Sequence, residues 1–171
     1  AKVGQPKAAT TATSGPRILE HTTPNGLLVV VVENHAVPLI TVEIAVKNGA
    51  LAEPPKFAGL SHLYEHMFFK ANAVYPSQEA YMARANELGI RFNGTTGTER
   101  VNYYFTTTSD HADAAMEFMR DAMLTLSFDA KELEKERVVV TGEMDRAEAN
   151  PFYLFSRAVS EKVWFKYPTR K

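Results

Sequence analysis

The stretch GLSHLYEHMFFK, Gly59 to Lys70, decides how the rest of the chain is interpreted. It predicts a helix, and residues four apart on a helix project from one face, one turn apart. His62 and His66 have this spacing, so two imidazole nitrogens can reach one ion at the distance that zinc favours. Glu65 lies beside His62 around the helix, close enough to touch a metal-bound water without being a ligand. The order H-x-x-E-H inverts the zinc-helix pattern H-E-x-x-H.

The alternative is an ordinary amphipathic helix whose histidines are satisfied core residues. A single histidine on an apolar face favours that interpretation. Two histidines at ligand spacing with a carboxylate between them favour a metal site instead. In a random chain of this composition, with 5 histidines, the pattern would arise about one time in a hundred.

The two histidines do not complete a site, because a catalytic zinc generally has three protein ligands. His21, His35 and His111 lie beside predicted strands or at a helix start, which favours surface or capping roles. The chain contains no cysteine, so a third ligand should be a carboxylate. Glu136 and Glu143 stand out because residues seven apart lie on nearly the same helical face. Spacing alone does not select among the downstream glutamates.

The remaining pattern predicts strands first and then a hairpin set among helices. Residues 39–47, LITVEIAVK, alternate apolar and polar side chains as a half-buried strand does. The predicted elements are a strand from Arg17, a turn at 24–26, strands at 27–32 and 39–47, helices at 59–70 and 77–88, a hairpin within 90–108, a helix capped by Ser109 or Asp110, and helices at 129–149 and 152–165. This order predicts an α+β fold, with a mainly antiparallel sheet and helices packed on one face.

The helix predicted over 129–149 contains one conflicting segment. Asp129 and Glu132 match an extended capping box, which favours a helix start. The segment VVVTG, 138–142, locally prefers a strand. Glu143 follows this apolar run and should be partly buried, where a carboxylate needs a partner such as a metal ion.

Composition limits the classes of partner. A net charge of −1 gives no electrostatic footprint for nucleic acid or an anionic membrane, and no apolar run approaches the roughly 20 residues of a membrane span. Residues 1–16, rich in Ala, Thr, Gly and Pro, predict a flexible arm before a single domain at 17–171. We expect this arm to be the mature start of an exported, periplasmic protein; a cytoplasmic location is the alternative.

From Arg17 to the C-terminus the chain resembles the pitrilysin-type (inverzincin) zinc peptidases of family M16, which include insulin-degrading enzyme and the mitochondrial processing peptidases. The resemblance takes in Gly49, Glu53, the H-x-x-E-H helix, the FNGTTGTERVNYYF hairpin and EKERVVVTGEMDRAEANP. The segment EMDRAEANPFYLF is most similar to the shorter bacterial members. In this family the third zinc ligand is a glutamate 77 positions after the second histidine, and that position here is Glu143.

The resemblance implies a role for each matching residue. His62, His66 and Glu143 would bind one Zn²⁺ per chain, and Glu65 would be the general base. Glu136 matches a second acidic position near the ligands, which would orient them. The resemblance also implies substrate binding by an edge strand that Asn93 opens, at Asn93, Gly94 and Thr95. Here the chain departs from the family pattern, with Glu99 and Val101 in place of Asp and Thr, so the details of substrate binding stay open.

The resemblance thus implies a zinc-dependent endopeptidase that hydrolyses peptides or unfolded segments, built on a processing-peptidase-like half-domain. Family enzymes close a chamber from two homologous halves. We therefore expect the domain at 17–171 to be truncated at its C-terminus, or to need a homologous second domain or partner subunit. The alternatives are a non-catalytic subunit of the same fold and a metal-binding scaffold without hydrolysis.

Overall fold

The computed structural model describes residues 15–164. These residues divide into two compact units, and the boundary in the sequence lies between Pro38 and Leu39. Apart from Gly15 and Pro16, the arm predicted at 1–16 lies outside the described residues, as does the last residue of the helix predicted over 152–165. Within residues 15–164, no helix is both long enough and apolar enough to cross a membrane.

The first unit is the predicted hairpin. Strands β1 (Arg17–Thr22) and β2 (Leu28–Glu33) pair antiparallel, with Arg17 opposite Glu33. The guanidinium of Arg17 lies 3.8 Å from the Glu33 carboxylate. Gly26 takes a φ of 87° in the turn, a backbone conformation that glycine adopts without steric cost.

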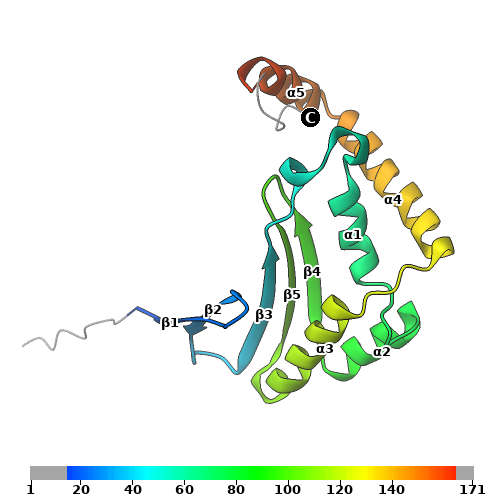
Figure 1. Cartoon of the computed structure of the whole chain (residues 1–171). Coiled ribbons are helices and arrows are strands. Elements are labelled where there is room, and N and C mark those ends of the chain that lie inside the picture. Colours follow the sequence, from blue (N-terminus) through cyan, green and yellow to red (C-terminus); the bar gives the residue numbers. More distant parts are fainter. Residues whose placement is uncertain (1–14, 165–171) are drawn as a thin grey trace, which may run out of the picture. The chain divides into compact units, whose positions relative to one another are not determined.

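The second unit contains a three-stranded antiparallel sheet with the order β3-β5-β4 (Figure 1). Its strands are β3 (Leu39–Val46), β4 (Arg91–Thr96) and β5 (Val101–Thr108). The helices are α1 (Leu60–Phe68), α2 (Gln78–Glu87), α3 (Ala112–Leu124), α4 (Ala130–Glu148) and α5 (Pro151–Val163). β4 lies at one edge of the described sheet, beside α1 (Figure 1).

The core lies between the sheet and its helices. Alternate side chains of β5 are buried, because every second residue of a strand points to the same face. Tyr103 stacks on Phe68 of α1 at 4.1 Å between ring centroids, and Phe105 stacks on Phe118 of α3 at 5.2 Å. Since both helices join one buried cluster, the predicted arrangement of helices on one face is confirmed (Figure 1).

Helix α4 runs unbroken through the valine segment that locally prefers a strand. Asp129 caps its start by accepting hydrogen bonds from the backbone N–H groups of Lys131 and Glu132, each at 3.0 Å. Val138 is exposed, whereas Val140 is only 6% exposed and lies on the side that faces α1. The cap and this packing decide the conformation, because intrinsic propensity is a weak preference that tertiary contacts override.

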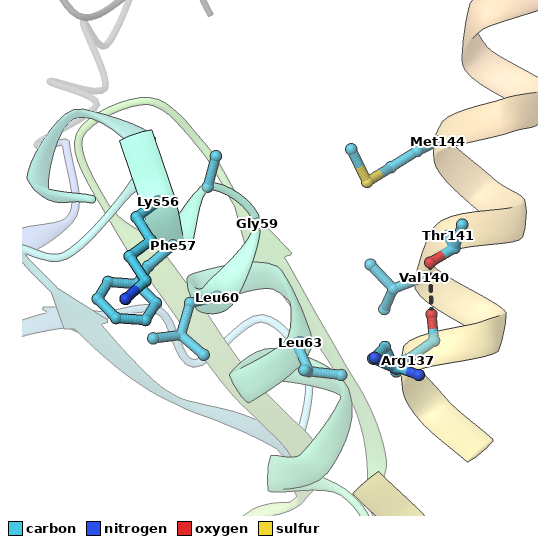
Figure 2. Close-up of a pocket in the computed structure, with 10 residues that line it drawn as sticks. Lys56, Phe57, Gly59, Leu60, Leu63, Arg137, Val140, Thr141 and Met144 are labelled. Carbon is cyan, nitrogen blue, oxygen red and sulfur yellow. Dashed lines mark hydrogen bonds between the residues drawn. The ribbon is translucent and has the colours of Figure 1, made fainter. Parts of the chain in front are cut away.

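Helices α1 and α4 also border an apolar hollow of about 450 Å³, near the start of α1. Leu60 and Leu63 of α1 face Val140 and Met144 of α4 across it (Figure 2). The same two helices carry the residues of the candidate site.

Candidate metal centre

The start of α1 is fixed by a carboxylate from outside the helix. Glu53 accepts hydrogen bonds from the backbone N–H groups of Gly59 at 2.7 Å and Ser61 at 2.6 Å. These groups have no partner within a helix, so a carboxylate there caps the first turn and complements the helix dipole. Gly59 takes a φ of 93°, which a residue with a side chain rarely adopts. Glu53 and Gly59 together fix the start of α1, and therefore the position of the helical turn that carries His62 and His66.

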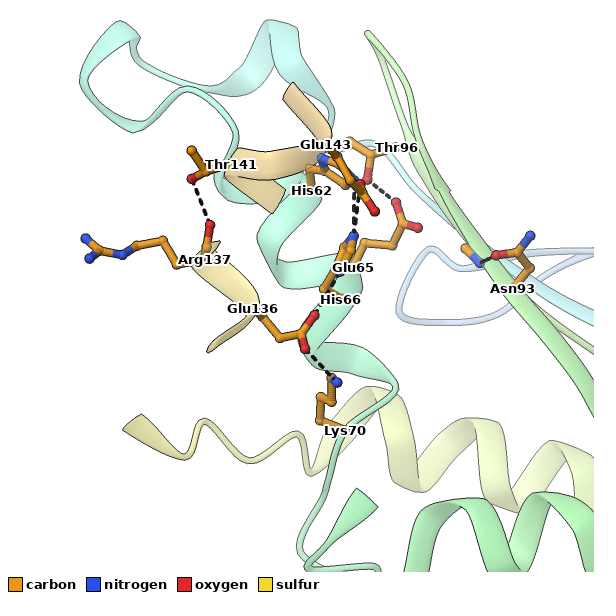
Figure 3. A network of polar contacts seen from close by, with 11 residues as sticks. His62, Glu65, His66, Lys70, Asn93, Thr96, Glu136, Arg137, Thr141 and Glu143 are labelled. Carbon is orange, nitrogen blue, oxygen red and sulfur yellow. Dashed lines mark hydrogen bonds and ion pairs between the residues drawn. The ribbon is translucent and has the colours of Figure 1, made fainter. Parts of the chain in front are cut away.

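Three polar side chains from α1 and α4 converge on one point (Figure 3). The Nε2 atoms of His62 and His66 lie 3.3 Å apart. Glu143 Oε2 lies 3.4 Å from His62 Nε2 and 3.6 Å from His66 Nε2. Among residues 15–164, this is the group of histidine and acidic side chains whose donor atoms lie close enough to hold a metal ion.

The donor set fits zinc. Ligand atoms that lie 2.0–2.1 Å from a tetrahedral ion are about 3.3 Å from one another. The three separations of 3.3, 3.4 and 3.6 Å are close to this value. Two imidazole nitrogens and one carboxylate oxygen are also ligands that zinc commonly takes, and a cation between them would satisfy all three electron pairs.

A buried ion pair holds one of the imidazoles in place. Glu136, 7% exposed, accepts a hydrogen bond from His66 Nδ1 at 2.9 Å and pairs with Lys70 Nζ at 2.6 Å. Burial raises the pKa of the Glu136 carboxyl, but the hydrogen bonds from Lys70 and His66 outweigh burial, and the pKa lies below its usual value. The ionised carboxylate keeps the proton on Nδ1 and therefore leaves Nε2 as the electron-pair donor.

Glu65 lies on the side of α1 that faces the edge strand. Its Oε2 accepts a hydrogen bond from the Thr96 hydroxyl at 2.5 Å (Figure 3). Gly94 leaves room for this side chain, because a Cβ at position 94 would lie 2.7 Å from Glu65 Cγ. No residue described by the structure donates a hydrogen bond to Oε1.

The site opens into a hollow of about 420 Å³. The two histidines, Glu65, Glu136 and Glu143 all line it, together with the apolar side chains of Phe69, Met82 and Phe92. A bound molecule could therefore reach the donor atoms and the Glu65 carboxylate from the same space.

The three residues of the expected substrate strand lie differently. Gly94 faces Glu65, whereas Asn93 and Thr95 pair with residues of β5 that point to the other side of the sheet. The Asn93 side chain accepts a hydrogen bond from the Gly94 backbone N–H at 2.9 Å (Figure 3), and Asn93 lines the same hollow as the histidine pair. Val101, where the chain departs from the family pattern, is buried in the core.

The other histidines lie apart from this centre. His111 donates from Nδ1 to the Leu88 carbonyl oxygen at 3.1 Å, so it connects the start of α3 to the end of α2. His21 and His35 are exposed in the first unit.

Sequence reasoning assigned no role to Thr96, Lys70 or Glu53. The sequence does indicate that Lys70 could lie near the site, because it follows His66 by four residues and would continue the same helical face. Thr96 lies on the hairpin that was already expected to bind substrate, but its partner depends on how that hairpin meets α1. Nothing in the local pattern connects Glu53 with a helix that starts seven residues later.

Comparison with known proteins agrees with this geometry. Residues 28–170 match the model of the insulinase family, peptidase family M16. The chain is 31% identical over 134 residues to an uncharacterized zinc protease, YmxG, of Bacillus subtilis, covering 78% of this chain and 32% of that protein. It is 29% identical over 147 residues to human insulin-degrading enzyme, covering 78% of this chain and 14% of the enzyme.

The fold is also similar to a solved structure. The crystal structure of a protease from Helicobacter pylori superposes with a TM-score of 0.73 and 26% identity, covering 81% of this chain and 33% of that one. The chain thus spans about a third or less of the length of these relatives. The family match over 28–170, with the relatives named zinc proteases and the convergent donor set, shows that the chain belongs to the pitrilysin-type peptidases of family M16, the insulinase family.

Proposed function

We propose that this chain forms the catalytic part of a zinc-dependent endopeptidase that hydrolyses peptides or unfolded segments. The observation that carries the proposal is the position of one carboxylate, Glu65, beside a set of three donor atoms that fits zinc. The relatives named zinc proteases support the same metal.

In this proposal, His62, His66 and Glu143 hold one zinc ion per chain. Zinc bound there would polarise a carbonyl and lower the pKa of bound water to about 7. Glu136 keeps His66 oriented through Nδ1, and Lys70 keeps Glu136 ionised.

Glu65 performs the proton transfers. Its carboxylate accepts the proton of the attacking water and later delivers that proton to the leaving nitrogen, as the peptide bond breaks. The hollow that Glu65 shares with the donor atoms gives a scissile bond access to both.

The edge of β4 provides a place for an extended substrate. A peptide that pairs there as an added strand would bind mainly through its backbone, which gives loose sequence selectivity. The backbone of Asn93, Gly94 and Thr95 would supply the hydrogen bonds. Because the chain covers only 32% and 14% of these two relatives, we further propose that a homologous second domain or partner subunit completes the binding chamber.

The test is the substitution Glu65→Gln in the complete enzyme. Glutamine has nearly the same shape but cannot accept the water proton, so we expect zinc content to be unchanged and cleavage of a quenched fluorescent peptide to fall by about 100-fold or more. Glu117→Gln, which alters an exposed glutamate on α3, is the matched control and should cleave at the parent rate. Equal turnover in Glu65→Gln and the parent enzyme would end the hydrolase assignment.

The competing proposal of a non-catalytic subunit makes the opposite prediction. If the chain is a non-catalytic subunit, neither the parent nor Glu65→Gln should raise the rate at which an active partner subunit cleaves the peptide.

A further inference from the structure

The register of the edge strand brings one hydroxyl to the Glu65 carboxylate. In the β4–β5 pairing, Gly94 lies opposite Tyr103 and Thr96 lies opposite Val101, two buried residues that point toward the helices. Thr96 therefore faces α1, and its Oγ1 lies 2.5 Å from Glu65 Oε2. The contact joins residues 31 positions apart, on a strand and a helix.

A single segment holds both elements in place. In the segment 49–53, the backbone N–H groups of Ala50 and Leu51 donate to the carbonyl oxygens of Gly97 and Thr98, at 3.1 and 2.9 Å. These hydrogen bonds join the segment to the turn that follows β4. Glu53, two residues further along, caps the start of α1. The end of the edge strand and the start of the helix are thus tied to the same five residues, 49–53.

Gly94 brings the Glu65 side chain against the strand. A Cβ at this position would approach Glu65 Oε1 to 2.9 Å as well as Cγ to 2.7 Å. The carboxylate therefore lies in a slot, with the bare backbone of Gly94 on one side and the Thr96 hydroxyl at one oxygen.

We propose that Thr96 is a positioning residue for the reaction, which holds Glu65 through Oε2 so that Oε1 is the oxygen that accepts and returns the proton. This inference rests on the proposed function of Glu65 as general base. A carboxylate held at one oxygen loses little freedom on reaching the reactive geometry, and small misplacements of catalytic groups cost large factors in rate.

The position of Thr96 has a consequence for substrate binding. The same strand that would pair with an extended peptide also carries the hydroxyl that orients the base. The scissile bond and the proton acceptor are therefore placed by one rigid element, and Thr96 influences the chemical step more than it influences binding.

The test compares Thr96→Val, which keeps the side-chain shape without the hydroxyl, with Thr96→Ser, which keeps the hydroxyl. In the complete zinc-loaded enzyme we expect Thr96→Val to lower kcat by about 10- to 100-fold, with KM within about twofold of the parent and zinc content unchanged. Thr96→Ser should retain kcat within about threefold. The control is Thr106→Val, which removes a hydroxyl that bonds to Thr41 on the exposed face of the same sheet.

Parent-like kcat in Thr96→Val, or an equal loss in Thr96→Ser, would overturn the proposal. A second measurement does not depend on activity: crystal structures of the parent and Thr96→Val should show the Glu65 carboxylate ordered in the first and rotated or disordered in the second. An unmoved carboxylate would overturn the proposal for Thr96. Failure of the proposed function itself would be recognised by a different result, because the parent and Glu65→Gln would then cleave the peptide at equal rates.

Discussion

The two ring nitrogens of His66 have different partners. Its Nε2 lies among the donor atoms, and its Nδ1 donates to Glu136, which pairs in turn with Lys70. A carboxylate that is 7% exposed needs a charged partner to stay ionised, and Lys70 provides one at 2.6 Å. Removing this lysine should therefore affect the metal centre without touching a ligand.

We expect Lys70→Met to weaken zinc binding by about 10- to 100-fold, because Glu136 would orient His66 less firmly. Competition with a chelating dye measures this change. Lys135→Met is the control, since Lys135 pairs with Glu132 on the surface of α4 and should bind zinc like the parent. Unchanged affinity in Lys70→Met would show that the ion pair does not support the centre.

At the scale of elements, the position of the edge strand depends on a close backbone contact. A Cβ at Gly49 would lie 2.4 Å from the Gly97 carbonyl oxygen and 2.7 Å from the Arg100 backbone nitrogen. Backbone atoms cannot rotate aside as a side chain can, so the segment and the turn after β4 would have to separate.

Gly49→Ala should therefore lower the free energy of unfolding by about 1–3 kcal/mol, as overpacking does. Urea denaturation followed by circular dichroism measures this. Gly142→Ala is the matched control, because Gly142 lies within α4 with open space around it. There alanine should raise stability by up to about 1 kcal/mol through its helix propensity. Equal stability of Gly49→Ala and the parent would contradict the close approach.

At the scale of the whole second unit, the candidate metal centre draws on two helices whose site residues lie about 80 positions apart in sequence. Two donors come from α1 and one from α4, so a bound ion would add a link between two helices that are already in contact. A ligand that binds only the folded state stabilises it by about 2.7 kcal/mol at a concentration 100 times its Kd.

Zinc at that excess should raise Tm by roughly 5–10 °C, since 1 kcal/mol shifts Tm by about 2–4 °C in a chain of this size. Glu143→Gln should lose most of this shift and show a lower zinc content by metal analysis. Glu148→Gln, which changes an exposed residue near the end of the same helix, should keep both. Parent-like zinc content in Glu143→Gln would exclude Glu143 as a ligand.

Much of the fold could be predicted from local pattern. The alternation of β5, the cap at Asp129 and the break at Pro151 each depend on neighbours within a few residues, and the structure has the expected element at each place. The valine run at 138–142 was ambiguous for the same reason, because its helical state depends on Val140 packing toward α1.

The sequence by itself determined the histidine pair, since a helical turn is enough to bring His62 and His66 to one face. It also determined Glu143 as the third candidate through its spacing in the family. Only the tertiary structure decided which groups hold these residues: Lys70, in the turn after α1, with Glu136 of α4, and Thr96 with Glu65 across a strand and a helix. Such contacts depend on how elements pack and on strand register, and neither is encoded by the periodicity of a single element.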